Sequence, residues 1–355
     1  MNKKIVIRII PKLKIGGVER GILKEIELLK VNTSLNISYH LIIIEKSDLL
    51  IESFPPHITV HYLNTKFFNF IKISKKILSI RQSPDDKIIV ISSLWKSHIQ
   101  NIASYILSRG KFKKGVFFHS DNYAHIIDKI VSKISFHYSD FVLFDSEKTM
   151  AAYQTNKQKF IIPFNFKRNN KLYTEKLDPS FVYVGRINKV KGIDRAIDLF
   201  SYINKKIPDA KFDIFGPDEG ELNNLNHKVS SLGMTNNITF YPSISYEMVD
   251  SILVNYTFYL QLSHREGLAA SVMQAQSMGL IPIVTPVGEI PFYCHDEYNS
   301  IIVNHTSSYE KKSQVISRLL KDTSILLRMK KNAIDTVKEY PSYDDKFIEM
   351  LTTIS

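Results

Sequence analysis

The sequence predicts an α/β protein of two domains, each built on a doubly wound parallel sheet, and three observations lead to this fold class. Short aliphatic runs recur along the 355 residues, and they are apolar throughout rather than alternating, as strands covered on both faces are. Segments with apolar residues at helical spacing lie between most of these runs. The length itself suits two domains of roughly 150 residues each.

The first half of the chain begins with an expected strand at residues 5–10 and an expected helix at 18–30, in which Val18, Ile22 and Ile26 share one face. Four further aliphatic or aromatic runs are expected to be strands: residues 38–44, 87–92, 115–118 and 141–144. Residues 1–165 are therefore predicted to form an N-terminal domain.

The pattern breaks at residues 163–180, which hold two prolines and few aliphatic residues, so the domain boundary is placed there. A strand at 181–184 and a helix at 192–206 restart it. Four more strands are expected: residues 211–215, 237–241, 257–262 and 281–285. Residues 166–340 are predicted to form a C-terminal domain, and residues 341–355 a last helix.

The positive charge is concentrated in the first half. The chain has 47 Lys and Arg against 35 Asp and Glu, a net charge of +12, and residues 1–165 alone have 25 against 13. Two lysine clusters, at 72–76 and 111–114, have aromatic residues beside them. This asymmetry leaves open an anionic membrane surface, a phosphate-bearing substrate, nucleic acid or an ordinary solvated face. No RNP, zinc-finger or helix-turn-helix pattern supports nucleic acid, which is therefore not expected as a partner.

The compartment and the metal content follow from what the sequence lacks. Cys294 is the one cysteine, so no disulfide can form within the chain, which fits a reducing compartment. No run approaches the roughly 18 apolar residues of a membrane span, and the protein is expected to be cytoplasmic. No cluster of His, Cys and acidic residues has the spacing of metal ligands, so no metal or other cofactor is expected.

Two strand-to-helix turns are candidates for phosphate binding. Gly16 and Gly17 let the backbone approach a ligand, and the helix that follows offers free N–H groups. Arg186 and Lys191 follow the strand at 181–184, at the carboxyl end where open α/β sheets bind ligands. Arginine can hold phosphate with two N–H groups, and lysine acts as a point charge. A plain turn and a pair of surface cations are the alternative interpretations.

The most informative segment spans residues 260–284. It reads as a strand, a loop with Glu266 and Gly267, a helix that Gly267 opens, and a second strand. The backbone N–H groups at the start of that helix would be unpaired, which makes them candidates for holding an anion. They belong to Leu268, Ala269 and Ala270.

This arrangement resembles the donor site of glycosyltransferase family 4, of the bacterial surface-polysaccharide type. That family is retaining, uses nucleotide sugars and has the GT-B fold, in which two Rossmann-like domains face a central cleft. The resemblance implies that residues 1–165 bind the acceptor and residues 166–340 bind the nucleotide-sugar donor. It also suggests that the last helix, residues 341–355, crosses back to the N-terminal domain. The matches occur in the family's order from residue 16 to about residue 303. Three further segments match: Gly16-Gly17-Val18-Glu19-Arg20, Gly185-Arg186 with Lys191-Gly192, and Val287-Gly288-Glu289-Ile290-Pro291.

The resemblance implies a role for each candidate residue. Four residues would be catalytic: Glu266 would bond the hydroxyls of the transferred sugar, His119 matches a position near the sugar, and Arg186 and Lys191 would grip the donor diphosphate. The remaining residues would bind the donor: Gly16 and Gly17 from the first domain, and Gly267, Leu268, Ala269, Ala270 and Gln274 from the second.

Position 274 departs from the family pattern, which has a second glutamate eight residues after the first. Gln274 can still accept a hydrogen bond through its carbonyl and donate one through its amide. Hydrogen bonds to a charged group are roughly twice as strong as neutral ones. A weaker or altered contact to the nucleotide ribose is therefore expected.

The sequence thus predicts a metal-independent hexosyltransferase that moves a sugar from a nucleoside-diphosphate sugar to an acceptor hydroxyl with retention. The resemblance and the basic first half together suggest a lipid-linked glycan acceptor, as in lipopolysaccharide O-antigen or capsule synthesis. Residues 1–165 would then meet the anionic inner face of the cell membrane, to which the protein would be peripheral. Two alternatives stay open: a GT-B sugar-nucleotide epimerase and a non-catalytic protein that binds a nucleotide or a glycan.

Overall fold

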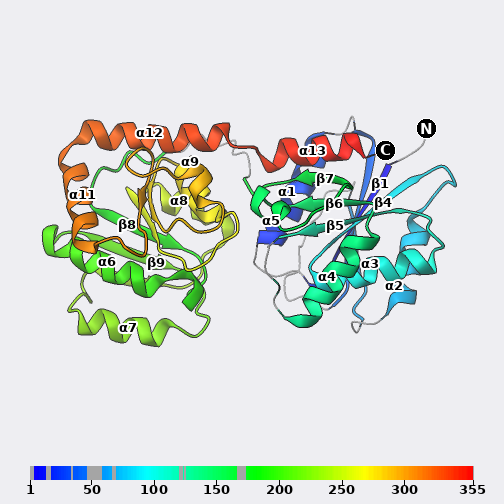
Figure 1. Ribbon diagram of the computed structural model, residues 1–355, viewed down its shortest axis with the longest axis horizontal. Helices are drawn as coiled ribbons and strands as arrows, with labels where there is room; N and C mark the ends of the chain where they lie inside the picture. The colour runs from blue at the N-terminus through cyan, green and yellow to red at the C-terminus, as the bar shows by residue number, and fades with distance from the viewer. Residues whose placement is uncertain are drawn as a thin grey trace. The chain divides into compact units, whose positions relative to one another are not determined.

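The computed structural model divides the chain into two compact units, which are shown in Figure 1. Unit 1 comprises Met1–Lys167 and Ser342–Ser355, and unit 2 comprises Arg168–Pro341. The structure describes residues 4–12, 17–32, 35–45, 58–65, 69–119, 123, 125–165 and 173–354.

Unit 1 contains, within its described residues, a seven-stranded parallel sheet in the order β3-β2-β1-β4-β5-β6-β7. The order reverses beside β1, as in a doubly wound sheet. The strands are β1 (Lys4–Ile10), β2 (Ile37–Ile43), β3 (Ile58–Tyr62), β4 (Lys87–Ser93), β5 (Lys113–Phe118), β6 (Phe141–Phe144) and β7 (Gln158–Ile161). The helices are α1 (Gly17–Val31), α2 (Phe70–Ile80), α3 (Trp95–Leu107), α4 (Ile126–Tyr138), α5 (Glu147–Ala151) and α13 (Tyr343–Thr353).

The helices of unit 1 lie in two layers. Helix α3 packs between α2 and α4, whereas α1 contacts α13. Figure 1 shows α13 on one side of the strands and α3 and α4 on the other. The layer with α2 encloses a cluster of isoleucines from the strands and from α2, since Ile73 and Ile77 reach the same core as Ile5, Ile7 and Ile9. The largely apolar character of β1 is thus explained by burial on both faces.

Helix α13 is tied to unit 1 by a buried charge. Arg8 of β1 and Glu25 of α1 form an ion pair of 3.2 Å, and both side chains are at most 1% exposed. The hydroxyls of Tyr39 and Tyr343 each donate to the Glu25 carboxylate, at 2.5 and 2.6 Å. The ring of Tyr343 also stacks on Phe164. Arg8 therefore interrupts the apolar run of β1 because it neutralises a carboxylate that holds the last helix.

Unit 2 contains, in the part that the structure describes, a six-stranded parallel sheet in the order β10-β9-β8-β11-β12-β13. The strands are β8 (Ser180–Val184), β9 (Lys211–Phe215), β10 (Ile238–Tyr241), β11 (Phe258–Gln261), β12 (Ile281–Val284) and β13 (Ile301–Ile302). The helices are the 3-10 turn η2 (Lys189–Lys191), α6 (Ile193–Lys206), α7 (Leu222–Ser231), α8 (Tyr246–Leu253), α9 (Ala270–Ser277), α10 (Ile290–Tyr293), α11 (Tyr309–Lys321) and α12 (Thr323–Glu339). The order reverses beside β8, which places the β8 and β11 ends at the position where open α/β sheets bind ligands.

Candidate functional site

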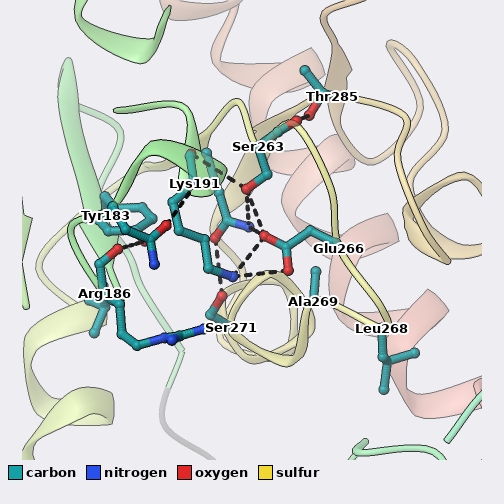
Figure 2. A network of polar contacts seen from close by, with 12 residues as sticks. Tyr183, Arg186, Lys191, Ser263, Glu266, Leu268, Ala269, Ser271 and Thr285 are labelled. Carbon is teal, nitrogen blue, oxygen red and sulfur yellow. Dashed lines mark hydrogen bonds and ion pairs between the residues drawn. The ribbon is translucent and has the colours of Figure 1, made fainter. Parts of the chain in front are cut away.

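The candidate site in unit 2 centres on an ion pair at the carboxyl ends of β8 and β11. Lys191 ends the short turn η2, and Glu266 lies in the loop between β11 and α9. The Lys191 Nζ lies 2.8 Å from Glu266 Oε1 and 3.0 Å from Oε2. The two side chains are 19% and 7% exposed, so the pair is largely shielded from solvent but still reachable. Figure 2 shows the lysine and the glutamate meeting within a wider network of polar contacts.

The Glu266 carboxylate is held in one orientation by neutral donors. Gln261 Nε2 donates to Oε1 at 2.8 Å, and Ser263 Oγ lies 2.6 Å from the same oxygen. The Gln261 amide is itself fixed, since Ser271 Oγ donates to its oxygen at 3.1 Å. Three donors thus converge on Oε1, while Oε2 receives Lys191, so Oε2 is the oxygen better placed to accept a ligand hydroxyl.

Two glycines let the surrounding backbone approach this loop. Gly192 follows Lys191 with φ +60°, and a Cβ there would lie 2.0 Å from the Leu262 carbonyl oxygen. Gly288 has φ +64°, and a Cβ there would lie 2.4 Å from the Glu266 carbonyl oxygen. Any side chain at these positions would push Lys191 or the loop away. The Gly288 position also explains why the segment at 287–291 belongs to the site.

The loop enters α9 through a strained residue. Ala269 has φ +56° and ψ +59°, a left-handed conformation that costs alanine about 1–2 kcal/mol. Helix α9 therefore begins at Ala270 and not at Gly267, where the sequence had placed its start. The N–H groups of Leu268, Ala269 and Ala270 donate to no partner in the described part of the chain, and no side chain caps the helix. Strain of this kind is typical of functional loops, and the free N–H groups suit an anion.

Arg186 follows β8 but is held differently from Lys191. It is 58% exposed, and its Nη1 lies 3.3 Å from both carboxylate oxygens of Glu219. The Asn188 amide donates to the same carboxylate at 2.7 Å and, together with Arg186, lowers the pKa of Glu219. Figure 2 shows Arg186 at the same end of the sheet as Lys191 and Glu266. The site therefore offers one shielded and one exposed cation.

Gln274 lies on α9 and is 5% exposed. Its Nε2 donates to Asp250 Oδ1 of α8 at 2.7 Å. The amide is therefore bonded to a carboxylate that the sequence analysis did not single out. No sequence signal marked Asp250, because its relevance comes only from the hydrogen bond that joins α8 to α9 in the structure.

Three candidate residues belong to unit 1. Gly17 begins α1, and Gly16 lies outside the described residues. His119 follows β5, where its ring packs 4.1 Å from the Phe117 ring and 5.4 Å from the Phe164 ring. Both of its ring nitrogens are buried with no hydrogen-bond partner among the described residues. Burial, with the Arg8 charge as a second cause, holds the pKa of His119 well below its usual value, so the ring is neutral at pH 7.

Within the residues that the structure describes, neither a cluster of metal ligands nor a membrane-spanning helix is found. No group of three or more His, Cys, Asp or Glu side chains there could hold a metal ion. No helix in the same residues is long and apolar enough to cross a membrane.

Residues 165–336 match the family model of glycosyl transferases group 1. Over 172 residues the chain is 28% identical to a poly(glycerol-phosphate) alpha-glucosyltransferase of Bacillus subtilis (strain 168). This match covers 46% of this chain and 24% of that protein. Over 138 residues it is 25% identical to a GDP-mannose:cellobiosyl-diphosphopolyprenol alpha-mannosyltransferase of Xanthomonas oryzae pv. oryzae. This match covers 38% of this chain and 36% of that protein. The matches thus span about a third or less of these relatives' length.

Solved structures resemble the chain over nearly its whole length. Sucrose-phosphate synthase from Thermosynechococcus elongatus has a TM-score of 0.77 at 16% identity, over 98% of this chain and 97% of that one. Anabaena HepE in complex with UDP and glucose has a TM-score of 0.75 at 13% identity, over 98% of this chain and 99% of that one. At such identities the likeness concerns the fold, and it confirms the α/β, GT-B class expected from the sequence.

Proposed function

We propose that this chain, whose residues 165–336 form a group 1 glycosyltransferase domain, transfers a sugar from a nucleoside diphosphate to an acceptor hydroxyl. The observation that carries the proposal is the shielded pair of Lys191 and Glu266 beside the uncapped start of α9. A cation, an oriented carboxylate and free N–H groups are what a sugar joined to a diphosphate needs from a protein.

In the proposed reaction, negative charge grows on the leaving diphosphate as the anomeric bond breaks. Lys191, Arg186 and the N–H groups of residues 268–270 supply donors that are already oriented towards one end of the sheet. Removing one preorganised donor of this kind typically costs about 100–1000-fold in rate. Glu266 Oε2 accepts a hydrogen bond from a hydroxyl of the sugar and so fixes the orientation of the sugar ring. The proposal includes retention of configuration and needs neither a metal nor another cofactor.

The acceptor is proposed to carry phosphate and to be linked to lipid. The names of two relatives describe acceptors of related chemistry, a poly(glycerol-phosphate) and a cellobiosyl-diphosphopolyprenol. The +12 charge of residues 1–165 would attract such a molecule at the inner face of the cell membrane. A lipopolysaccharide or capsule precursor is the acceptor class that we favour. Neutral His119, with two unpartnered ring nitrogens, is the candidate in unit 1 for a hydrogen bond to a hydroxyl.

The first test is donor binding. Thermal unfolding is measured with UDP, GDP, ADP, CMP and their sugars, on the wild type and on Arg186→Ala. A ligand at 100 times its dissociation constant should stabilise the fold by about 2.7 kcal/mol. One base should raise the melting temperature of the wild type, and the shift should shrink in Arg186→Ala.

Arg318→Ala is the matched control, because Arg318 is 61% exposed and pairs with Glu297 much as Arg186 pairs with Glu219. It should keep the full shift. If no nucleotide stabilises the wild type, the proposed donor site is wrong. Turnover of the stabilising donor without any acceptor would instead indicate an epimerase.

A further inference from the structure

Helix α4 faces the opposite way from an ordinary surface helix. Its isoleucines at 126, 127, 130 and 134 and its Tyr138 are between 46% and 67% exposed. Its fully buried residues are Val131, Ser132 and Ser135, and the partly buried Phe136 packs against the aromatic core of unit 1. A helix of a soluble protein normally buries its apolar stripe and exposes its polar residues. Contiguous exposed apolar surface of this kind marks an interaction site.

The exposed residues form one stripe. At 3.6 residues per turn, Ile126, Ile130, Ile134 and Tyr138 follow one another along the helix, and with Ile127 they span an arc of about 120°. The exposed His137 lies within this arc, in the last turn of the helix. Lys129 and Lys133 are also exposed and flank this arc on one side. Helix α3, which packs against α4, also ends in two exposed apolar residues, Ile106 and Leu107. Figure 1 shows the two helices next to each other at one face of unit 1.

We propose that this α4 face, defined by Ile126, Ile127, Ile130, Ile134 and Tyr138, docks unit 1 on an anionic lipid bilayer. An amphipathic helix with lysines beside its apolar stripe lies in the interface plane, with the apolar side chains at the boundary of headgroups and acyl chains. The inference deepens the proposed function, on which it rests, by naming the surface that meets the membrane.

Charge selects a bilayer over a second copy of the chain. The one acidic residue within α4 is Asp128, whose carboxylate accepts a hydrogen bond of 3.0 Å from the hydroxyl of the buried Ser132. Its charge therefore lies on the side of the helix away from the apolar stripe. Asp140, just after α4, pairs with Lys114. A second copy would bring the same two lysines and the same basic first half to the contact, whereas anionic headgroups complement them.

The lysine clusters noted in the sequence do not offer such a surface. Phe112, Phe117 and Phe118, which lie beside the second cluster, are core residues. Lys114 is 7% exposed and is bonded to Asp140. Lys72 of the first cluster donates to the Leu63 carbonyl. The apolar part of the proposed surface comes instead from α4, which lies outside both lysine clusters.

The test is co-sedimentation of the full chain with vesicles of phosphatidylcholine, alone or with about a third phosphatidylglycerol, at low and high salt. The wild type should bind the anionic vesicles and release them at high salt. Ile130→Ser/Ile134→Ser should weaken binding by about tenfold or more. Lys129→Glu/Lys133→Glu should remove the preference for anionic lipid. The control Met248→Ser/Leu327→Ser changes two apolar residues of unit 2 with similar exposure and should bind like the wild type.

Three outcomes would overturn the proposal: no binding of the wild type to anionic vesicles, equal binding of Ile130→Ser/Ile134→Ser, or a wild-type dimer that this variant dissociates. Each variant is also tested for stabilisation by the donor nucleotide, which reports that the chain is folded. A variant that no longer binds vesicles but is still stabilised by the donor nucleotide has lost only the function of the α4 face. Vesicle binding without any donor stabilisation would count against the proposed function alone.

Discussion

Replacing Gln274 by Glu gives this chain the second glutamate of the family pattern, and the structure predicts that the change is costly. The Gln274 Nε2 donates to Asp250 Oδ1 at 2.7 Å, and Gln274 is 5% exposed. The substitution removes the donor and brings a second carboxylate to a position where an amide now bonds. The chain carries glutamine at this position, we infer, because α8 already places a carboxylate there.

The size of the effect follows from two competing costs. At an effective dielectric constant of about 20, two unit charges about 4 Å apart repel by about 4 kcal/mol. Protonating the introduced glutamate instead costs about 5 kcal/mol at pH 8, because its ordinary pKa is about 4.3. At pH 8 the repulsion between two charged carboxylates therefore costs less than protonation of the glutamate, and movement of the side chains reduces it further. The free energy of unfolding should fall by about 3–4 kcal/mol at pH 8. At pH 5 protonation costs only about 1 kcal/mol, so most of the loss should be recovered.

The assay is urea unfolding of the wild type and Gln274→Glu at pH 8 and pH 5. The control is Asp250→Asn/Gln274→Glu, which reverses the direction of the carboxylate–amide hydrogen bond without creating a pair of charges. It should unfold within about 1 kcal/mol of the wild type at both pH values. A Gln274→Glu variant as stable as the wild type at pH 8, with no change at pH 5, would refute the reasoning.

Two further outcomes are expected in unit 1. Glu25→Gln leaves the Arg8 charge buried without its carboxylate, so the free energy of unfolding should fall by about 3 kcal/mol; Glu349→Gln, in an exposed pair with Lys346, should leave it unchanged. Burial, followed by the Arg8 charge, lowers the pKa of His98 to about 3, so between pH 6.5 and 3 the unfolded chain binds a proton that the folded chain does not. Stability present at pH 7 should therefore be lost as the pH falls, by about 2 kcal/mol at pH 5, and unfolding of His98→Asn should show a shallower loss.

The fold could be predicted where strands lie inside a sheet. Central strands such as β1, β4 and β11 are covered on both faces, so their sequences are predominantly apolar and stand out. The strands that the sequence analysis missed are β3, β7 and β13, each of which lies at the edge of its sheet. An edge strand has one neighbour and is partly exposed, so its residues are mixed and the pattern is lost.

The site could be predicted only in part. Arg186, Lys191 and Glu266 stood out because cations and a carboxylate follow apolar strands directly. The residues that orient them did not, because Gln261 and Ser263 become relevant only when β11 ends beside the Lys191 turn. The family resemblance suggested that the last helix returns to the first domain, but not the residues that hold α13 there. Arg8, Glu25, Tyr39 and Tyr343 are far apart in the chain, so no local pattern links them.

The reversed orientation of α4 shows why periodicity alone cannot say which side of a helix is buried. Aromatic rings of the sheet and the neighbouring loops fill the space beneath this helix: Phe118 stacks on Tyr153 at 4.6 Å and on Phe144 at 6.0 Å. Helix α4 adds one ring to this layer, Phe136, which packs against Phe118 and Tyr153. The residues that α4 buries fully are small or of moderate size: Val131, Ser132 and Ser135. The isoleucines are left on the outside, so the apolar stripe that normally anchors a helix to its own core is free for a surface outside the chain.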